Sequence, residues 1–189
     1  MVWIGGRPER SGVIFDAIRQ LERSSDRAIA IIASAILEEH MTNVIKRRWQ
    51  QHPTTIARIL HPEGPLGSFG PKIDLVLLMG LISSEGHADL KLIKRIRNRF
   101  AHYLEVDNFE TPEIRSRCFE LKHFEKFVLT NAEMSGPTPP KKLFGIAGMD
   151  EKLKTPGGRF IVAVQVYSVL FGGDFPAHLP PPNVPSPIY

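Results

Sequence analysis

An arginine and a histidine stand five residues apart near the middle of the chain, at Arg97 and His102, and Asn98 follows the arginine directly. The planar guanidinium of Arg97 could hold the non-bridging oxygens of a phosphodiester. Histidine exchanges protons near neutral pH, so His102 could take a proton from a ribose 2′-hydroxyl or give one to the leaving oxygen. Asn98 could orient either group. These residue types therefore permit phosphodiester cleavage without a metal ion.

The same residues also permit a purely structural role. Five residues turn an ideal helix by about 140°, so Arg97 and His102 would flank Asn98 and could not meet without bending or local unwinding. In the structural alternative His102 would bond a backbone group, and Arg97 would cap helix carbonyls or pair with an acid. The candidate acids are Asp26, Glu38 and Glu39. The spacing alone leaves both hypotheses open.

The segment around this pair carries five cations and no acid between positions 91 and 102. We call this set the cationic ridge, and it consists of Lys91, Lys94, Arg95, Arg97 and Arg99. Such a ridge is either solvated and paired with acids elsewhere, or offered to the phosphates of a nucleic acid. The candidates for nucleic-acid contact are Lys91, Lys94, Arg95 and Arg99. A net charge of +4 and a pI near 9.3 permit a polyanionic partner without requiring one.

Hydrophobic spacing predicts that helices position these residues. Glycines and prolines divide the chain into expected helices at 12–23, 26–50, 54–60, 71–79, about 84–103 and about 112–131. Residues 134–158 are expected to be irregular. The valine-rich run 159–171 favours a strand by propensity, but its length and the lack of a partner strand favour a helix docked on the bundle. The fold class is therefore all-α.

The expected organisation is a single-domain helical bundle at 11–133. A linker and a C-terminal helix packed on the bundle follow at 134–175, and a proline-rich extended tail at 176–189 ends the chain. On the ridge helix, the apolar side is expected to pack inward and consists of Leu92, Ile93, Ile96, Phe100 and Tyr103.

Composition narrows the function classes further. A chain of 189 residues with 42% hydrophobic and 23% charged residues is typical of a globular protein. Its one cysteine, Cys118, excludes an internal disulfide and a multi-thiolate zinc site. Glu38-Glu39-His40 lacks a further ligand at suitable spacing, so we expect neither metal nor cofactor. No secretory signal is visible and the apolar runs are shorter than the roughly 20 residues of a membrane span. We expect a cytoplasmic protein without membrane contact.

Two local motifs invite other hypotheses. The order of helix 71–79, the turn at 80–83 and a basic helix mimics a helix-turn-helix, whose groove residues would be His87, Lys91, Lys94 and Arg95. The second helix is about twice the usual recognition length and uses much of its surface for packing, which argues against DNA reading. The glycine-rich loop 64–72 lacks the Gly-Lys-Ser/Thr ending of a P-loop, so turn geometry and close packing explain its glycines better.

Several of these motifs, taken in order, closely resemble the mannitol operon repressor (MltR-like) family. The resemblance rests on Gly64-Pro65-Leu66-Gly67-Ser68-Phe69, Lys72-Ile73-Asp74-Leu75, Gly80-Leu81-Ile82-Ser83, the run from Asp89 to His102, and Ser25-Asp26-Arg27-Ala28. It covers roughly residues 24–103. The family-motif positions it singles out are Asp26, Arg27, Gly67, Ser68, Lys72 and Asp74.

That family is similar to the broader HEPN superfamily of α-helical bundles, which often dimerise. Many HEPN members carry an Arg-x4–6-His motif, and some are metal-independent ribonucleases. Carried over, the motif falls on Arg97, Asn98 and His102. The resemblance implies a repressor-type regulator that acts through a protein partner, such as a transcription regulator or an antitoxin-like protein, and forms a homodimer. The alternative that it implies is a HEPN-type endoribonuclease or toxin that binds RNA and uses Arg97 and His102 at a dimer cleft.

Overall fold

The computed structural model describes residues 24–125 and 149–172, and every regular element within them is a helix. These helices are α2 (Asp26–Arg48), α3 (Pro53–Leu60), α4 (Phe69–Leu78), α5 (Ser84–His102), α6 (Pro112–Glu120), α8 (Met149–Lys152) and α9 (Pro156–Gly172). The all-α prediction is confirmed. The expected helix 12–23 and the tail 176–189 lie outside the described residues.

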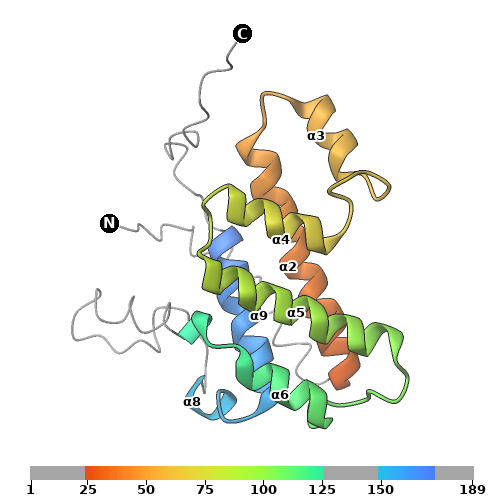
Figure 1. Ribbon diagram of the computed structural model, residues 1–189, viewed down its shortest axis with the longest axis vertical. Coiled ribbons are helices and arrows are strands. Elements are labelled where there is room, and N and C mark those ends of the chain that lie inside the picture. Colours follow the sequence, from red (N-terminus) through yellow and green to blue (C-terminus); the bar gives the residue numbers. More distant parts are fainter. Residues whose placement is uncertain (1–23, 126–148, 173–189) are drawn as a thin grey trace, which may run out of the picture.

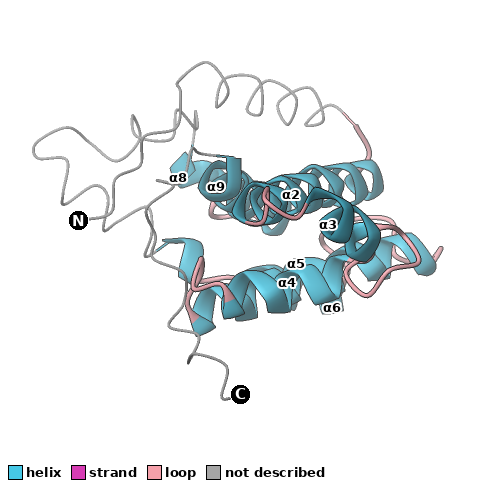
Figure 2. Ribbon diagram, turned by 90° about the horizontal axis from the view of Figure 1, so that it is seen from above, coloured by secondary structure: helices cyan, strands magenta, loops and turns pink. Residues whose placement is uncertain are grey.

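The helices form two layers (Figure 2). One layer holds α2 and α9 side by side, with α3 and α8 at its ends, and the other holds α4, α5 and α6. α5 packs against α2 across the layers and lies between α4 and α6 within its own layer (Figure 1). The core lies between the layers, where Leu37, Ile93 and Phe160 are completely buried.

α2 begins and ends much as its sequence predicts. The Ser25 hydroxyl accepts a hydrogen bond from the Ala28 amide at 3.3 Å, which satisfies a free donor of the first turn. Lys46, Arg47 and Arg48 occupy the last turn, where the backbone dipole favours cations. Its 23 residues are also long and apolar enough to cross a membrane, although uninterrupted apolar runs predicted no such segment. Since α2 packs against α9, α5 and α4, that apolar surface serves the core of the bundle.

The valine-rich run 159–171, for which the sequence left a strand and a helix open, lies within the helix α9. Twelve of its 17 residues are buried, because α2 covers one side and α6 another. A strand here would need hydrogen-bonding partners, and no strand exists in the described parts of the chain. The region before it is less irregular than expected, because α8 covers Met149–Lys152 and α9 begins at Pro156.

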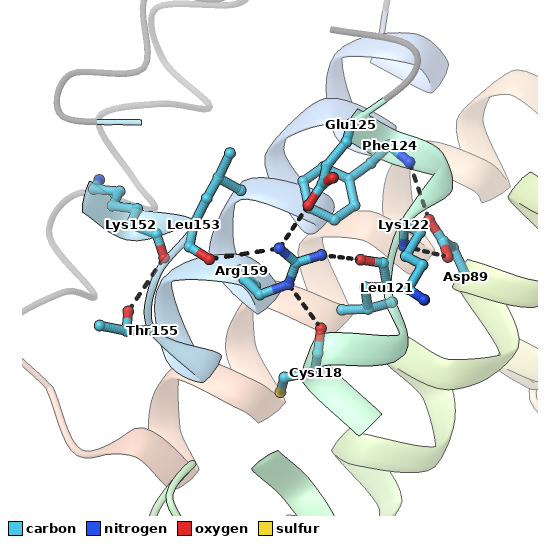
Figure 3. A network of polar contacts seen from close by, with 10 residues as sticks. All are labelled: Asp89, Cys118, Leu121, Lys122, Phe124, Glu125, Lys152, Leu153, Thr155 and Arg159. Atoms are coloured by element: carbon cyan, nitrogen blue, oxygen red, sulfur yellow. Dashed lines mark hydrogen bonds and ion pairs between the residues drawn. The ribbon is translucent and has the colours of Figure 1, made fainter. Parts of the chain in front are cut away.

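The prediction of one helix over 112–131 is wrong, because α6 ends at Glu120 and the backbone is extended at Leu121. Side chains distant in sequence stabilise the break (Figure 3). The Arg159 guanidinium donates to the carbonyl oxygens of Cys118 (3.2 Å) and Leu121. The Asp89 carboxylate accepts from the amides of Lys122 (3.2 Å) and Phe124 (3.1 Å). Helix resumes at 123–125, and the rest of the predicted segment lies outside the described residues.

Candidate functional site

The cationic ridge lies on one unbroken helix, α5. The Ser83 hydroxyl caps its first turn by accepting from the Gly86 amide, and Gly80, at a φ of 68°, ends the preceding helix region. Ile93, Ile96 and Phe100 are fully buried, as predicted. Tyr103 is an exception, because it ends the helix with extended backbone and remains 43% exposed. The inward packing of α5 turns most of the cations outward.

Arg97, Asn98 and His102 keep the separation that an ideal helix imposes. Arg97 Nη1 donates to Asn98 Oδ1 at 2.9 Å, and both residues are partly buried. His102 is exposed at the end of α5, and no hydrogen bond joins its ring to a described residue. Because α5 continues through His102, the ring points about 140° away from the direction of Arg97. Within one protomer, the two groups therefore do not converge on one point.

Two of the three acids proposed as structural partners of Arg97, namely Asp26 and Glu38, are engaged elsewhere. Asp26 Oδ2 accepts a hydrogen bond from the Phe109 amide at 2.8 Å. Glu38 Oε1 pairs with Lys72 Nζ at 2.8 Å, and both of these side chains are largely buried. Ser83 caps the start of α5, and Arg27, rather than Arg97, donates hydrogen bonds to the carbonyl oxygens at its end.

Both ends of the cationic ridge are neutralised within the fold. Near its start, Asp74 Oδ1 of α4 accepts from Lys91 Nζ at 2.7 Å and from His87 Nε2 at 2.8 Å. The hydrogen bonds from Lys91 and His87 hold the pKa of Asp74 below its ordinary value. Near the ridge's end, Arg99 Nη2 lies 2.6 Å from Glu113 Oε2 of α6.

The middle of the ridge is different. Lys94, Arg95 and Arg97 form no ion pair with any acid in the described residues. Lys94 Nζ lies directly over Gly70 at the start of α4, where an added Cβ would approach it to 2.5 Å. Arg95 is exposed to solvent. The available charge of the ridge is therefore concentrated in its middle turn.

Arg27 and Asp26, at the head of α2, hold the segment that leaves α5. The Arg27 guanidinium donates to the carbonyl oxygens of Phe100, Tyr103 (3.1 Å), Leu104 (3.1 Å) and Val106 (2.7 Å). These carbonyls include the acceptors that a helix C-terminus leaves free. As a result Leu104 is held 89% exposed beside Tyr103. We call residues 103–106 the α5 exit.

The remaining family-motif positions belong to α4 and to the loop that precedes it. Lys72, with Glu38, ties α4 to α2. Gly67 has no room for a side chain, since an added Cβ would lie 2.3 Å from the carbonyl oxygens of His61 and Pro62. Ser68 occupies the N-cap position of α4 without a side-chain hydrogen bond to it. These positions build the scaffold rather than join the ridge.

Neither the predicted metal-like triplet nor the cysteine forms a reactive cluster. The searched, described residues contain no group of three His, Cys, Asp or Glu side chains that could hold a metal ion. The pKa of His40 is lower than its ordinary value, mainly because burial removes water from its ring. Burial raises the pKa of the Cys118 thiol to about 12, so this sulfur stays protonated and unreactive at neutral pH.

A comparison with protein families matches residues 16–152 to the mannitol repressor family, MtlR. The chain belongs to the mannitol repressor family. The match is longer than the resemblance seen at residues 24–103, and it ends before α9 begins at Pro156. No curated protein and no solved structure matches the chain. Membership of this family supports a repressor-type regulator.

The sequence located the motifs of this mannitol repressor family member but not their contacts. Arg27 reaches carbonyls 73 to 79 residues further along the chain, and no local pattern reveals that distance. The double pairing of Asp74 is likewise a contact between two helices. The one sequence signal that pointed toward these contacts was that Asp26, Arg27 and Asp74 are among the family-motif residues.

Proposed function

We propose that this member of the mannitol repressor family is a cytoplasmic regulator that represses through a protein partner rather than by reading DNA, and that it works as a homodimer. The observation that carries this proposal is the pairing of both His87 and Lys91 with Asp74. Two of the four side chains that a helix-turn-helix would send into the groove thus already have an acidic partner on α4, whose charge offsets the charge that they would offer to DNA.

The placement of α5 supports the same conclusion. A recognition helix enters the major groove, which is about 12 Å wide. α5 instead lies between α4 and α6 in one layer (Figure 1), so its neighbours would meet the DNA backbone before its side chains reached the bases. The Arg99–Glu113 pair further reduces the positive charge that α5 could offer to phosphates.

The outer side of α5 has the features of a protein-binding surface. Arg95 and His102 are exposed seven residues apart on this side, and Leu104 at the α5 exit is 89% exposed. Arginine and exposed apolar groups are favoured at protein interfaces. Because the Arg27 contacts hold the α5 exit in place, binding would cost little ordering. We propose that these three residues contact a partner surface that combines acidic and apolar side chains.

Quantitative co-purification from the native host tests this surface. The double variant Arg95→Glu, Leu104→Ser should lose a protein that wild type retains reproducibly. The matched control is Leu78→Ser, which removes another strongly exposed leucine (76%) at the far end of the α4–α5 pair. Recovery of nucleic acid alone, or loss of the same protein by the control, would contradict the proposal.

The homodimer has its own test. Light scattering on the purified chain should give twice the monomer mass of 21.2 kDa at micromolar concentration. A monomer that persists at concentrations where the regulator is active would remove this part of the proposal and leave the partner surface standing.

A metal-independent endoribonuclease of the HEPN type is the second candidate. Arg97 bonded to Asn98, with an exposed His102 on the same helix, supports it, provided that a second protomer brings its own pair into the cleft. RNA incubated with the protein in EDTA should then be cleaved, and His102→Ala should abolish cleavage. The control is His61→Ala, which removes another exposed histidine. Since His102 is exposed, neither change should alter the melting temperature, and cleavage that survives His102→Ala would refute the candidate.

A further inference from the structure

An apolar cavity of about 280 Å³, partly open to solvent, lies between α3, the loop that follows it, and α4. Ile56 and Ile59 of α3 form one side, Leu66 of the loop and Leu75 of α4 form another, and Trp49 closes the end next to α2. The residues that line the cavity include no Asp, Glu, Lys or Arg. In Figure 1, α3 projects from the end of the bundle, so this cavity is far from the α5 exit.

The glycine loop of the family motif forms one wall of the cavity. The Leu66 amide donates to the Ile59 carbonyl oxygen at 2.9 Å, which folds the loop back onto α3. This return is possible only with glycine at two positions. An added Cβ on Gly64 would lie 2.6 Å from the Arg58 carbonyl oxygen, and one on Gly67 would lie 2.3 Å from two others. The glycines therefore let Leu66 lie opposite α3 and complete the cavity.

The polar groups of the cavity are few and stand at its rim. His52 and Thr55, the remaining lining residues, are both exposed on their other sides. A ligand with one hydroxyl or carbonyl group could hydrogen-bond there. A polyol could not, because most of its hydroxyls would lose water without gaining a partner. The lining thus selects against the polar sugar alcohols suggested by the family's name.

We propose that the α3 cavity binds a small, uncharged and largely apolar molecule with a single polar group. The volume is sufficient, because an enclosed dry cavity of about 150 Å³ lined by aliphatic and aromatic side chains accepts benzene, and this partly open cavity has nearly twice that volume. A bicyclic aromatic alcohol is of the required class. This site goes beyond the proposed partner binding and does not depend on it.

Titration of the full chain with 1-naphthol, followed by NMR, tests the site. The chain has two tryptophans, and Trp3→Phe leaves the indole of Trp49 as the single tryptophan signal in a ¹⁵N-labelled protein. 1-Naphthol should shift this signal saturably, and mannitol should not. A shift that does not saturate, or an equal response to mannitol, would overturn the proposal.

A pair of matched variants assigns the binding to this cavity. Thr55→Phe places a ring at the rim and should weaken 1-naphthol binding by roughly tenfold or more. Thr54→Phe adds the same ring at the neighbouring exposed position, which does not line the cavity, and should leave binding unchanged. Both variants should keep the wild-type circular dichroism spectrum. Equal affinities of the two variants would refute the assignment, whatever the result of the partner and dimer experiments.

Discussion

One stretch of α5, from His87 to Lys91, carries two polar clusters that face opposite sides. Inward, the Asp89 carboxylate is 3% exposed and accepts from two backbone amides and from the Tyr167 hydroxyl at 3.1 Å. Outward, His87 and Lys91 meet Asp74, whose side chain is 52% exposed. We call Asp89 with its three donors the interior cluster, and Asp74 with His87 and Lys91 the Asp74 cluster.

The two clusters differ in how much the fold depends on them. A buried carboxylate is stable only while its hydrogen bonds are made, so the interior cluster requires the segment 122–124, which follows α6, and helix α9 to be in place. An exposed ion pair is screened by water and salt and can be broken at little cost. The interior cluster therefore specifies the fold, while the Asp74 cluster adjusts a surface.

Loss of the interior carboxylate should have the largest effect. Asp89→Ala would leave the amides of Lys122 and Phe124 without acceptors, together with the buried Tyr167 hydroxyl. Each unsatisfied buried donor costs about 1–3 kcal/mol, so the free energy of unfolding should fall by about 3 kcal/mol or more. Urea denaturation measures this change.

A milder change in the same cluster serves as its control. Tyr167→Phe removes one donor and leaves both amides bonded to Asp89, so the loss should be about 1 kcal/mol. Equal free energies of unfolding for Asp89→Ala and Tyr167→Phe would contradict the claim that the fold depends on the interior cluster.

The Arg27 hydrogen bonds should contribute less to stability than the interior cluster and more than the Asp74 cluster, because this side chain is half-buried. Arg27→Met keeps the aliphatic stem but removes the donors to the α5 exit, and should cost about 2 kcal/mol. It should also accelerate amide hydrogen exchange at residues 103–106. Arg58→Met, on an exposed face of α3, is the comparison and should change neither quantity.

His40 supplies a buried polar group without the hydrogen bonds of the interior cluster, since its Nδ1 is buried and has no partner. Desolvation lowers its pKa in the folded protein below the ordinary value of 6.5. The unfolded chain then binds more protons, so stability should fall as the pH drops below about 6.5 toward the lowered value. In His40→Gln this dependence should be weaker in urea melts at pH 7.5 and 5.5, and an unchanged dependence would exclude His40 as its source.

Loss of the Asp74 carboxylate should have the smallest effect. Asp74→Asn should reduce the free energy of unfolding by less than about 1 kcal/mol at neutral pH. The contribution is present above the ordinary pKa of aspartate and is lost as the pH falls through the lowered folded pKa. High salt should diminish it as well. A loss as large as that of Asp89→Ala would erase the contrast between the two clusters.

The sequence predicted what local rules determine and missed what distant contacts determine. The starts of α2 and α5 follow from Ser25 and Ser83, whose capping hydrogen bonds span three residues. The end of α6 could not be predicted, because Asp89 and Arg159 act there from 33 and 38 residues away. For the candidate site, the Arg97–Asn98 bond joins neighbours, whereas the neutralised ends of the ridge and the Arg27 contacts join separate helices.

The position of α9 in the chain bears on how the protein is made. α2, α4, α5 and α6 leave the ribosome before α9 does, yet α2 and α6 need α9 to cover their apolar sides. The Arg159 contacts that stabilise the end of α6 also arrive only with α9. Translation therefore produces most of the bundle before it can close. The nascent chain must stay partly open, and thus exposed to chaperones and proteases, until the residues of α9 emerge.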